Sequence, residues 1–517
     1  MTKKKLVFAG LYPMWHYHFV SELNLIQKHI AEGDEVFLLE CSESLLACEC
    51  NKNHQLHHCL RCIGIRQDGL QQIAGGNVGR ISLSKSQDFV KKAQGLIEYI
   101  SKLEDLKKLK YKEFDIGSAV FSSLVDHTLN TMPDIVENRD KILKLLADGI
   151  NTFEKFSDWL KINQPDHVFI FNGRYAVARA LLRACEQNDI PYSTHERTGN
   201  LKKIQLFPRS FPHDPRVYPR MAKELWAKQD SIPNFLEEGR DFFEERPKGQ
   251  LTGWQSFSSD QKSGLLPDNF KTSRRNIALL GSSEGEMLSI EGMIDGFEYP
   301  KQLEVYLSFL ELSYKKYPDL FFYLRLHPNS KNESNKWWES SHLKNMQNLQ
   351  IIAPESEVSS YSLLAACEKS VGLATTLCLE ATYWGKPSII LGPTYYSGID
   401  AVYEPKTLDE ACEVVADPSL PSKPKDHAIM FGAFMRCYGD ELPYSAPKNF
   451  YTMDFKGRIL EARREVHEWL GECEKRPEVS GIKKWLRDRK DRRDFAKLWE
   501  QCDGWFAETP KSHQNGI

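Results

Sequence analysis

One stretch of the chain, residues 359–392, combines hydroxyl, acidic and glycine residues in an order suited to binding a phosphorylated ligand. The pattern predicts a helix, a short strand, a turn that contains Thr375 and Thr376, a second helix and an apolar strand over 388–391. Backbone N–H groups and hydroxyls at a helix N-terminus form a site for phosphate. Glu380 follows one helical turn later, where a carboxylate is placed to bind a ribose diol. The alternatives are a threonine that only caps the helix and a glutamate in a surface ion pair.

A second polar group stands upstream of this stretch. Residues 321–326 predict a buried strand, and His327 and Pro328 follow it directly. Open α/β sheets bind ligands at the carboxyl ends of their strands, so His327 is a candidate ligand-binding side chain. Arg325 lies two residues earlier, as a second cation or as part of a structural ion pair. Together these features predict a nucleotide-sugar site.

The threonine pair, Glu380-Ala381, the Gly-Lys-Pro at 385–387 and the upstream His327-Pro328 resemble the donor half of a GT-B glycosyltransferase. The strongest resemblance is to bacterial capsule and lipopolysaccharide transferases, including those that use CMP-activated keto-sugars such as Kdo or sialic acid. It covers about residues 275–405. It implies an α/β fold of two Rossmann-like domains that face a cleft, and transfer of a sugar from a nucleotide donor to a glycan or glycolipid.

The resemblance also implies roles for individual residues. His327 would contact the donor phosphate and offset negative charge on the departing nucleotide. The loop after the strand over 276–280 would face the donor, although a plain polar turn fits the same residues. The implied donor-binding residues are Ser282, Ser283, Glu284, Arg325, His327, Ser360, Tyr361, Thr375, Thr376 and Glu380. CMP-linked donors are preferred, and UDP- and GDP-sugars remain open.

On the acceptor side, Glu196 is the candidate general base. It follows a predicted strand over 191–195, and a carboxylate at a strand end over the cleft can remove the proton from an acceptor hydroxyl. Residues 196–199 are similar to the acidic-then-glycine motif of these enzymes, unless Arg197 holds Glu196 in a structural ion pair. Other catalytic or acceptor-binding candidates lie in the loops after two predicted strands: His16, His18, Asn172 and Arg174.

Five cysteines fall within 22 residues, at Cys41, Cys48, Cys50, Cys59 and Cys62. The CxxC pair at 59 and 62 has a spacing that lets two thiolates reach one metal. The interpretation stays open between a structural zinc held by Cys41, Cys48, Cys59 and Cys62, free or redox-active thiols, and an iron–sulfur cluster. Because no Asp-x-Asp pair and no phosphate-binding Gly-x-x-x-x-Gly-Lys loop is present, catalysis is expected to need no metal or other cofactor.

The elements that position these residues alternate between strand and helix in two halves. The expected organisation is an N-terminal acceptor domain (1–250) with a cysteine-rich insertion (41–62), a linker (251–275), a nucleotide-sugar domain (276–450) and a helical tail (451–517). Strands are expected over 5–9, 35–40, 167–171 and 191–195 in the first half, and over 276–280, 321–326, 349–352 and 388–391 in the second. Residues 226–250 are expected to be helical.

Bulk properties narrow the class of protein. A chain of 517 residues with a net charge of -3 lacks the basic excess typical of a nucleic-acid binder. No apolar run approaches the roughly 20 residues that span a bilayer, so a cytoplasmic protein with at most peripheral contact at the inner membrane face is expected. Two other functions fit the sequence: a transferase that moves a polyol phosphate from a CDP-linked donor, and a non-enzymatic scaffold that responds to metal or redox state.

Overall fold

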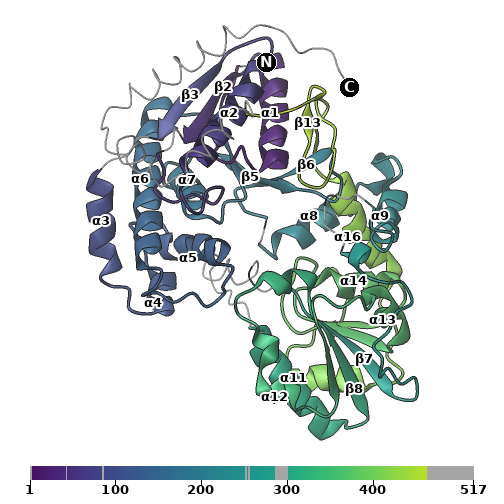
Figure 1. Cartoon of the computed structure of the whole chain (residues 1–517). Coiled ribbons are helices and arrows are strands. Elements are labelled where there is room, and N and C mark those ends of the chain that lie inside the picture. The colour runs from purple at the N-terminus through teal and green to yellow at the C-terminus, as the bar shows by residue number, and fades with distance from the viewer. Residues whose placement is uncertain are drawn as a thin grey trace, which may run out of the picture.

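The computed structural model describes residues 3–41, 44–83, 87–212, 214–250, 253, 257–283, 285 and 301–462. Two lobes lie one above the other, each built on its own sheet with helices packed against it (Figure 1). The expected architecture of two α/β halves is confirmed. Within the described residues, no helix is both long enough and apolar enough to cross a membrane.

The first lobe contains a seven-stranded sheet in the order β12-β6-β5-β4-β1-β2-β3. Its strands are β1 (Lys5–Phe8), β2 (Glu35–Cys41), β3 (Val78–Leu83), β4 (His167–Phe171), β5 (Tyr192–Arg197), β6 (Lys203–Pro208) and β12 (Asp440–Glu441). The strands β1 to β5 are parallel, whereas β6 and β12 extend one edge in antiparallel pairing. The strand order reverses between β1 and β4, and such a reversal opens a crevice at the carboxyl ends of the strands.

The described helices of the first lobe are α1 (His16–Ala31), α2 (Leu56–Gln71), α3 (Gln87–Ile97), α4 (Leu103–Lys108), α5 (Ile116–Thr128), α6 (Arg139–Asn163) and α7 (Ala176–Gln187). The long helix α6 packs against α3, α5 and α7. The cysteine-rich residues 41–62 run from the last residue of β2 into α2, which begins at Leu56. They therefore belong to the crossover from β2 to β3. The edge strand β3 was not foreseen, because its Gly79 and Arg80 weaken the alternating apolar pattern.

The second lobe contains a five-stranded parallel sheet in the order β11-β10-β7-β8-β9. Its strands are β7 (Arg275–Leu280), β8 (Leu320–Arg325), β9 (Leu349–Ile352), β10 (Lys369–Gly372) and β11 (Ser388–Ile390). Its helices include α11 (Gln302–Lys316), α12 (Ser341–Lys344), α13 (Ser360–Ala366), α14 (Thr376–Tyr383) and α15 (Leu408–Ala416). The helix–strand–turn–helix–strand order expected over 359–392 is confirmed. Here too the strand order reverses between the first strand, β7, and β10.

The lobes are joined by the helices α8 (Val217–Trp226), α9 (Phe235–Glu244) and α16 (Lys425–Cys437). They lie beside one another at the junction (Figure 1), and α16 packs against α8, α9 and α14. The helix expected over 226–250 is instead broken. A single 3-10 turn, η1 (Gln229–Ser231), precedes Pro233, and a proline cannot continue a helix because it lacks the N–H donor.

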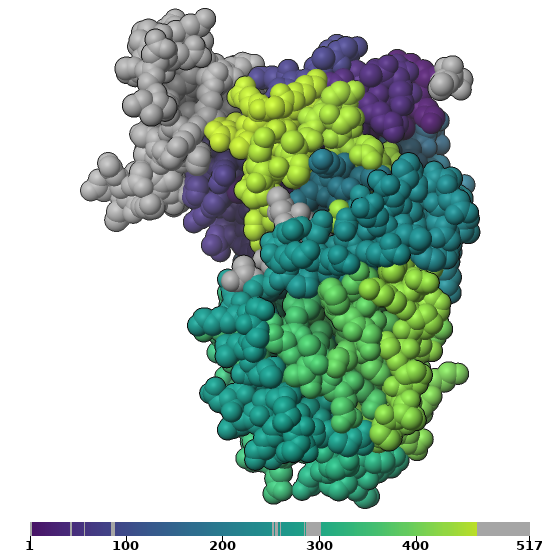
Figure 2. All heavy atoms as spheres, turned by 90° about the vertical axis from the view of Figure 1, so that its right-hand side faces the viewer, coloured from purple at the N-terminus to yellow at the C-terminus, as the bar shows by residue number. Residues whose placement is uncertain are grey.

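After α16 the chain returns to the first lobe. Residues 440 and 441 pair with β6, although the second domain was expected to extend to residue 450. Residues 442–462, the return segment, then lie over α1 and end in the hairpin β13 (Asp454–Phe455) and β14 (Arg458–Ile459). Figure 2 shows these yellow-green residues covering part of the first lobe. The helical tail was expected over 451–517, but its described part, residues 451–462, contains the hairpin and no helix, and residues 463–517 lie outside the described residues.

Candidate active site

A cleft of about 670 Å³ lies where the carboxyl ends of the two sheets face each other. From the first lobe it is lined by residues that follow β1 and β4 and by the end of β5. From the second it is lined by residues that follow β7, β8 and β10. These positions include both points of strand-order reversal, where open α/β sheets bind ligands. The cleft therefore joins the two halves of the site predicted from sequence.

Most of the predicted site residues line this cleft. They are His16, His18, Asn172, Arg174, Glu196, Ser282, Ser283, His327, Ser360, Tyr361, Thr375 and Thr376. Arg325 and Glu380 are not among the lining residues, because their side chains lie behind the cleft wall. Glu284 lies outside the described residues.

Glu196 is the central acidic group of the first-lobe wall. Strand β5 continues through Arg197, so Glu196 lies within the strand end rather than after it. Its Oε2 accepts a hydrogen bond from Asn172 Nδ2 at 2.8 Å, and its Oε1 accepts one from the Arg197 N–H at 2.9 Å. Asn172 has a φ of 59° and Gly173 a φ of 85°, a left-handed pair that turns the chain sharply after β4. The carboxylate is thus held in one orientation and keeps 22% of its side-chain surface exposed.

His18 lies beside this carboxylate, with Nε2 3.5 Å from Glu196 Oε1. Burial lowers the pKa of His18 well below its ordinary value, and the charges of Arg197 and His195 lower it further. The ring is therefore neutral at pH 7. Because helix α1 begins at His16, His18 belongs to its first turn and not to the loop predicted from sequence. The geometry suits His18 for positioning Glu196 or the acceptor.

His16 has a structural task that was not foreseen from the sequence. Its Nδ1 accepts a hydrogen bond from the Met453 N–H at 3.4 Å, which leaves the proton of the neutral ring on Nε2. That nitrogen donates to the Leu460 carbonyl at 3.2 Å. With both ring nitrogens bound to the return segment, His16 is not placed to move a proton. The structure thus argues against a catalytic His16.

The two arginines of the first-lobe wall are held by aromatic groups. The Arg197 guanidinium lies 4.6 Å from the Tyr17 ring centroid and 4.1 Å from that of Phe450, and it donates to the Phe450 carbonyl. It therefore turns toward the return segment, while its backbone N–H binds Glu196. Arg174 stacks over the Tyr175 ring at 4.7 Å and donates to its hydroxyl. Both guanidinium groups belong to residues that line the cleft.

On the second-lobe wall, His327 follows β8 as predicted. Its Nδ1 accepts the Asn329 N–H at 3.2 Å, so the proton of the neutral ring lies on Nε2. Burial, assisted by the charges of Arg325 and Arg246, lowers the pKa of His327 to about 4. The side chain is therefore a neutral hydrogen-bond donor at pH 7 rather than the cation that charge compensation would require.

The threonine turn has the geometry of a helix N-terminus. Thr375 is the N-cap of α14, and its Oγ1 accepts the Leu377 N–H at 3.4 Å. Ala374 adopts a φ of 50°, and the Tyr396 hydroxyl donates to the Thr375 carbonyl. A Cβ on Gly372 would meet Thr375 Cγ2 at 2.5 Å, so glycine is required for this close turn. Thr375, Thr376 and Leu377 all line the cleft, so the N-terminus of α14 lies at the cleft wall.

Glu380 is fully buried one turn further along α14. Its Oε1 lies 3.1 Å from Arg246 Nε, and its Oε2 accepts a hydrogen bond from the Tyr361 hydroxyl at 2.5 Å. Although burial alone would lower it, the Glu380 charge raises the pKa of Arg246 above its ordinary value. The structure thus places Arg246 and Tyr361 on the cleft wall and Glu380 behind them. A direct ribose contact by Glu380 is not what this geometry favours.

Arg246 is a candidate that was not predicted from the sequence. It lies just beyond α9, far along the chain from the donor motifs, and nothing in its local sequence marks it. The one available signal was Glu380 itself, because a buried carboxylate requires a cationic partner. Arg325 was predicted as a cleft cation or as part of an ion pair. Its guanidinium instead donates to the carbonyls of Ala353 and Ser356, and its side chain lies behind the cleft wall.

Glutamines hold two other donor-side residues, Ser282 and Ser360. Gln302 bonds to both the N–H and the carbonyl of Ser282, at 2.9 and 3.0 Å. Gln261, from the predicted linker, accepts the Ser360 N–H at 2.7 Å. The linker also contributes Phe257, whose ring packs against the edge of His327 at 5.1 Å between centroids. Linker residues are therefore part of the cleft wall.

The cysteines at 41–62 lie near one another within the first lobe. Burial raises the pKa of Cys41, Cys50 and Cys62, and the neighbouring Cys48 raises each further. Asn51 Nδ2 donates to Cys59 Sγ at 3.2 Å. Among the described residues, these cysteines form no group of three or more ligand atoms within 4.8 Å. The zinc site stays a prediction.

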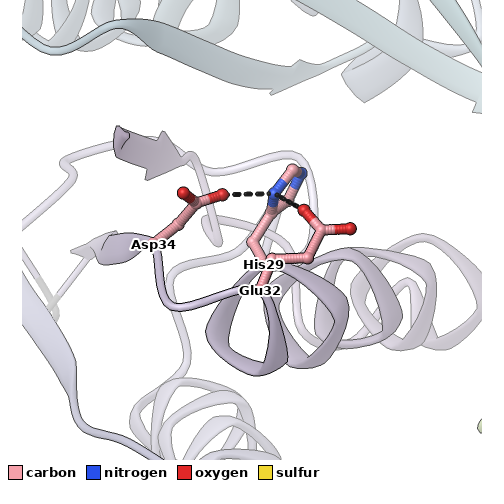
Figure 3. Close-up of side chains that lie close together, drawn as sticks. All are labelled: His29, Glu32 and Asp34. Carbon is pink, nitrogen blue, oxygen red and sulfur yellow. Dashed lines mark hydrogen bonds and ion pairs between the residues drawn. The ribbon is translucent and has the colours of Figure 1, made fainter. Parts of the chain in front are cut away.

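The described residues do contain one such group elsewhere, at the far end of α1 from the cleft: His29, Glu32 and Asp34 (Figure 3). The His29 Nδ1 atom lies 2.9 Å from Asp34 Oδ2 and 3.2 Å from Glu32 Oε2. Asp34 also accepts the Lys4 N–H, which ties α1 to the start of β1. Hydrogen bonding within the chain accounts for this group.

Comparisons with known proteins give structural similarity only. No protein-family model matches the sequence, and no curated protein matches it. The chain is similar in structure to the β-Kdo 2,4 transferase KpsC of Thermosulfurimonas dismutans, with 14% identity, a TM-score of 0.37, and coverage of 60% of this chain and 88% of that one. It is also similar to the UDP-GlcNAc 2-epimerase of Neisseria meningitidis, with 12% identity, a TM-score of 0.30, and coverage of 84% of this chain and 97% of that one. The calicheamicin glycosyltransferase CalG4 is similar as well, with 12% identity, a TM-score of 0.26, and coverage of 84% of this chain and 95% of that one. Because each TM-score is below 0.5, we base the function on the residues of the cleft.

Proposed function

We propose that the protein is a glycosyltransferase that moves a sugar from a nucleotide-activated donor to a hydroxyl of a glycan or glycolipid acceptor. The observation that carries this proposal is one cleft that holds an oriented carboxylate on the first-lobe wall and a helix N-terminus on the second. The carboxylate would activate the acceptor hydroxyl, and the helix N-terminus would bind the phosphate of the donor.

In this mechanism, Glu196 removes the proton from the attacking hydroxyl. Asn172 and the Arg197 N–H hold its two oxygens, so the carboxylate needs little reorganisation before it acts. The neutral ring of His18 adds no competing positive charge next to it. A fixed, partly exposed carboxylate is what general-base catalysis requires.

The departing nucleotide carries negative charge on its phosphate. The N–H groups at the start of α14, the Thr375 and Thr376 hydroxyls, the Nε2–H of His327 and the Arg246 guanidinium together stabilise that charge. Because these groups belong to the protein, the proposed mechanism uses no divalent metal. We prefer a CMP-linked keto-sugar such as Kdo as donor, with a surface polysaccharide or a lipid-linked glycan as acceptor.

A donor screen tests the proposal. The protein is titrated with CMP-, UDP-, GDP- and CDP-linked compounds, with its thermal midpoint as the readout and EDTA present, and products are identified by mass spectrometry. One nucleotide should raise the midpoint, and His327→Ala and Thr376→Ala should reduce that shift. A product that gains a sugar residue supports the proposal, whereas one that gains a polyol phosphate supports the phosphotransferase instead.

We also propose a cytoplasmic location with at most peripheral contact at the inner membrane face. Cell fractionation checks this part separately. Protein that stays with the membrane after a high-salt wash would contradict it.

A further inference from the structure

The return segment brings two aromatic residues, Phe450 and Tyr451, to the lining of the cleft. They come from the part of the chain that crosses back onto the first lobe, seen over that lobe in Figure 2. Tyr451 exposes 63% of its surface although the loop that carries it is held in place. Exposed aromatic surface in a cleft marks a ligand-binding position.

The loop that carries them is held at both ends. Before it, the Tyr444 N–H donates to Asn24 Oδ1 at 2.9 Å. After it, Met453 is buried against α1 and its N–H binds His16. At the tip, Asn449 Oδ1 accepts the N–H groups of Tyr451 and Thr452, at 2.9 and 2.8 Å. The position of the aromatic pair is thus set before any ligand binds.

The pair is also tied to the candidate base. Arg197 lies between the Tyr17 and Phe450 rings, and its own N–H binds Glu196. The Phe450 and Tyr451 rings lie 5.0 Å apart at 85°, so one ring edge supports the face of the other. One arginine therefore links the aromatic surface to the carboxylate that would activate the acceptor.

We propose that Phe450 and Tyr451 form the acceptor subsite, where the apolar face of a sugar ring stacks on Tyr451 and its hydroxyls reach Glu196 and Asn172. A sugar ring fits this surface because it combines an apolar C–H face with polar edges, as the wall combines aromatic rings with a carboxylate, an amide and a guanidinium. This inference rests on the proposed function and adds the acceptor side to it.

The test uses ligand-detected saturation-transfer NMR on the full chain with CMP present. The probes are the methyl glycosides of glucose, galactose, N-acetylglucosamine and Kdo. At least one should bind to the wild-type protein through its C–H protons. Tyr451→Ala should weaken that binding about fivefold, since an aromatic contact contributes about 1 kcal/mol. Tyr451→Phe should keep it within about twofold.

Tyr99→Ala is the matched control, because Tyr99 is 77% exposed and does not line the cleft. It should leave glycoside binding unchanged. Equal binding by wild type and Tyr451→Ala, or no binding of any glycoside to wild type, overturns the inference. Failure of every nucleotide in the donor screen overturns the proposed function instead, so the two failures are distinguishable.

Discussion

The Nε2 atom of His18 lies 3.5 Å from Oε1 of Glu196, so a neutral imidazole faces the carboxylate on the first-lobe wall of the cleft. The two residues come from the first helix and the fifth strand, and the sheet order β5-β4-β1 brings these elements together. Of the two, only Glu196 is both charged and exposed to the cleft. This relationship supports the proposal that Glu196, rather than His18, is the general base.

The first prediction concerns that role. Glu196→Gln keeps the shape and the contact with Asn172 but removes the basic carboxylate. We expect kcat to fall by about a hundredfold to ten-thousandfold, the range that general-base catalysis contributes. Nucleotide binding should not change. Glu137→Gln, on the exposed surface, is the control. A Glu196→Gln variant with near wild-type kcat would exclude Glu196 as the base.

The second prediction separates the structural and functional roles of the buried Arg246–Glu380 pair. Glu380→Ala leaves the Arg246 charge buried without its partner, so we expect a loss of about 3 kcal/mol in the free energy of unfolding. The double variant Arg246→Met with Glu380→Leu should recover most of that stability, because apolar groups can replace a buried ion pair.

The same double variant should bind nucleotide more weakly than the wild type, because it lacks the cation on the donor wall. Urea unfolding and nucleotide titration measure the two quantities separately. Normal nucleotide affinity in the double variant would show that Arg246 serves stability alone.

The third prediction tests the start of α14. Thr375→Ala removes a helix cap, which costs about 1 kcal/mol of stability, and should also weaken nucleotide binding. Thr375→Ser keeps the oxygen and should preserve both properties. Thr407→Ala is a matched control, because Thr407 caps α15 in the same way and does not line the cleft. It should lose stability without losing nucleotide affinity. Equal affinity losses in the two alanine variants would point to an indirect effect.

The fourth prediction concerns pH. Burial lowers the pKa of His127, His167 and His327 to about 4, whereas an unfolded histidine titrates near 6.5. Between these values the unfolded chain binds more protons, so the thermal midpoint should fall as pH decreases from 6.5 toward 4. His327→Gln should show a smaller fall than wild type, and His342→Gln, on the exposed surface, should match wild type. An unchanged fall in His327→Gln would contradict a buried neutral ring.

The fifth prediction concerns the cysteine cluster. If Cys41, Cys48, Cys59 and Cys62 hold a structural zinc, the purified protein contains about one zinc ion per chain. Cys59→Ser with Cys62→Ser should then lose the metal and lower the thermal midpoint. Elemental analysis and thiol titration measure this. Cys185→Ser, a buried thiol on α7, is the control for packing alone. A metal-free wild type with all these thiols reactive would exclude the zinc site.

Local pattern was enough to predict much of the fold and part of the site. Apolar runs of strand length alternate with helical periodicity, and parallel strands place their carboxyl ends at one edge of a sheet. For that reason Asn172 could be assigned to the ligand-binding edge of the first half, and His327 and Thr375 to that of the second, from the residues that precede them. That the two edges face one cleft was implied by the resemblance alone. The threonine turn could also be predicted from the sequence, because helix capping and close glycine packing are local properties.

The tertiary structure alone decided what each polar group contacts. His16 looked like a catalytic candidate until Met453, 437 residues later, bound its Nδ1. Glu380 looked like a ribose ligand, yet its carboxylate forms an ion pair with Arg246, from the junction between the lobes. Such contacts join residues that are distant in sequence, and burial and charge pairing fix them only after the sheets have packed. The sequence by itself therefore determined two α/β halves and their strand-end loops, and packing decided which side chains of those loops face the cleft.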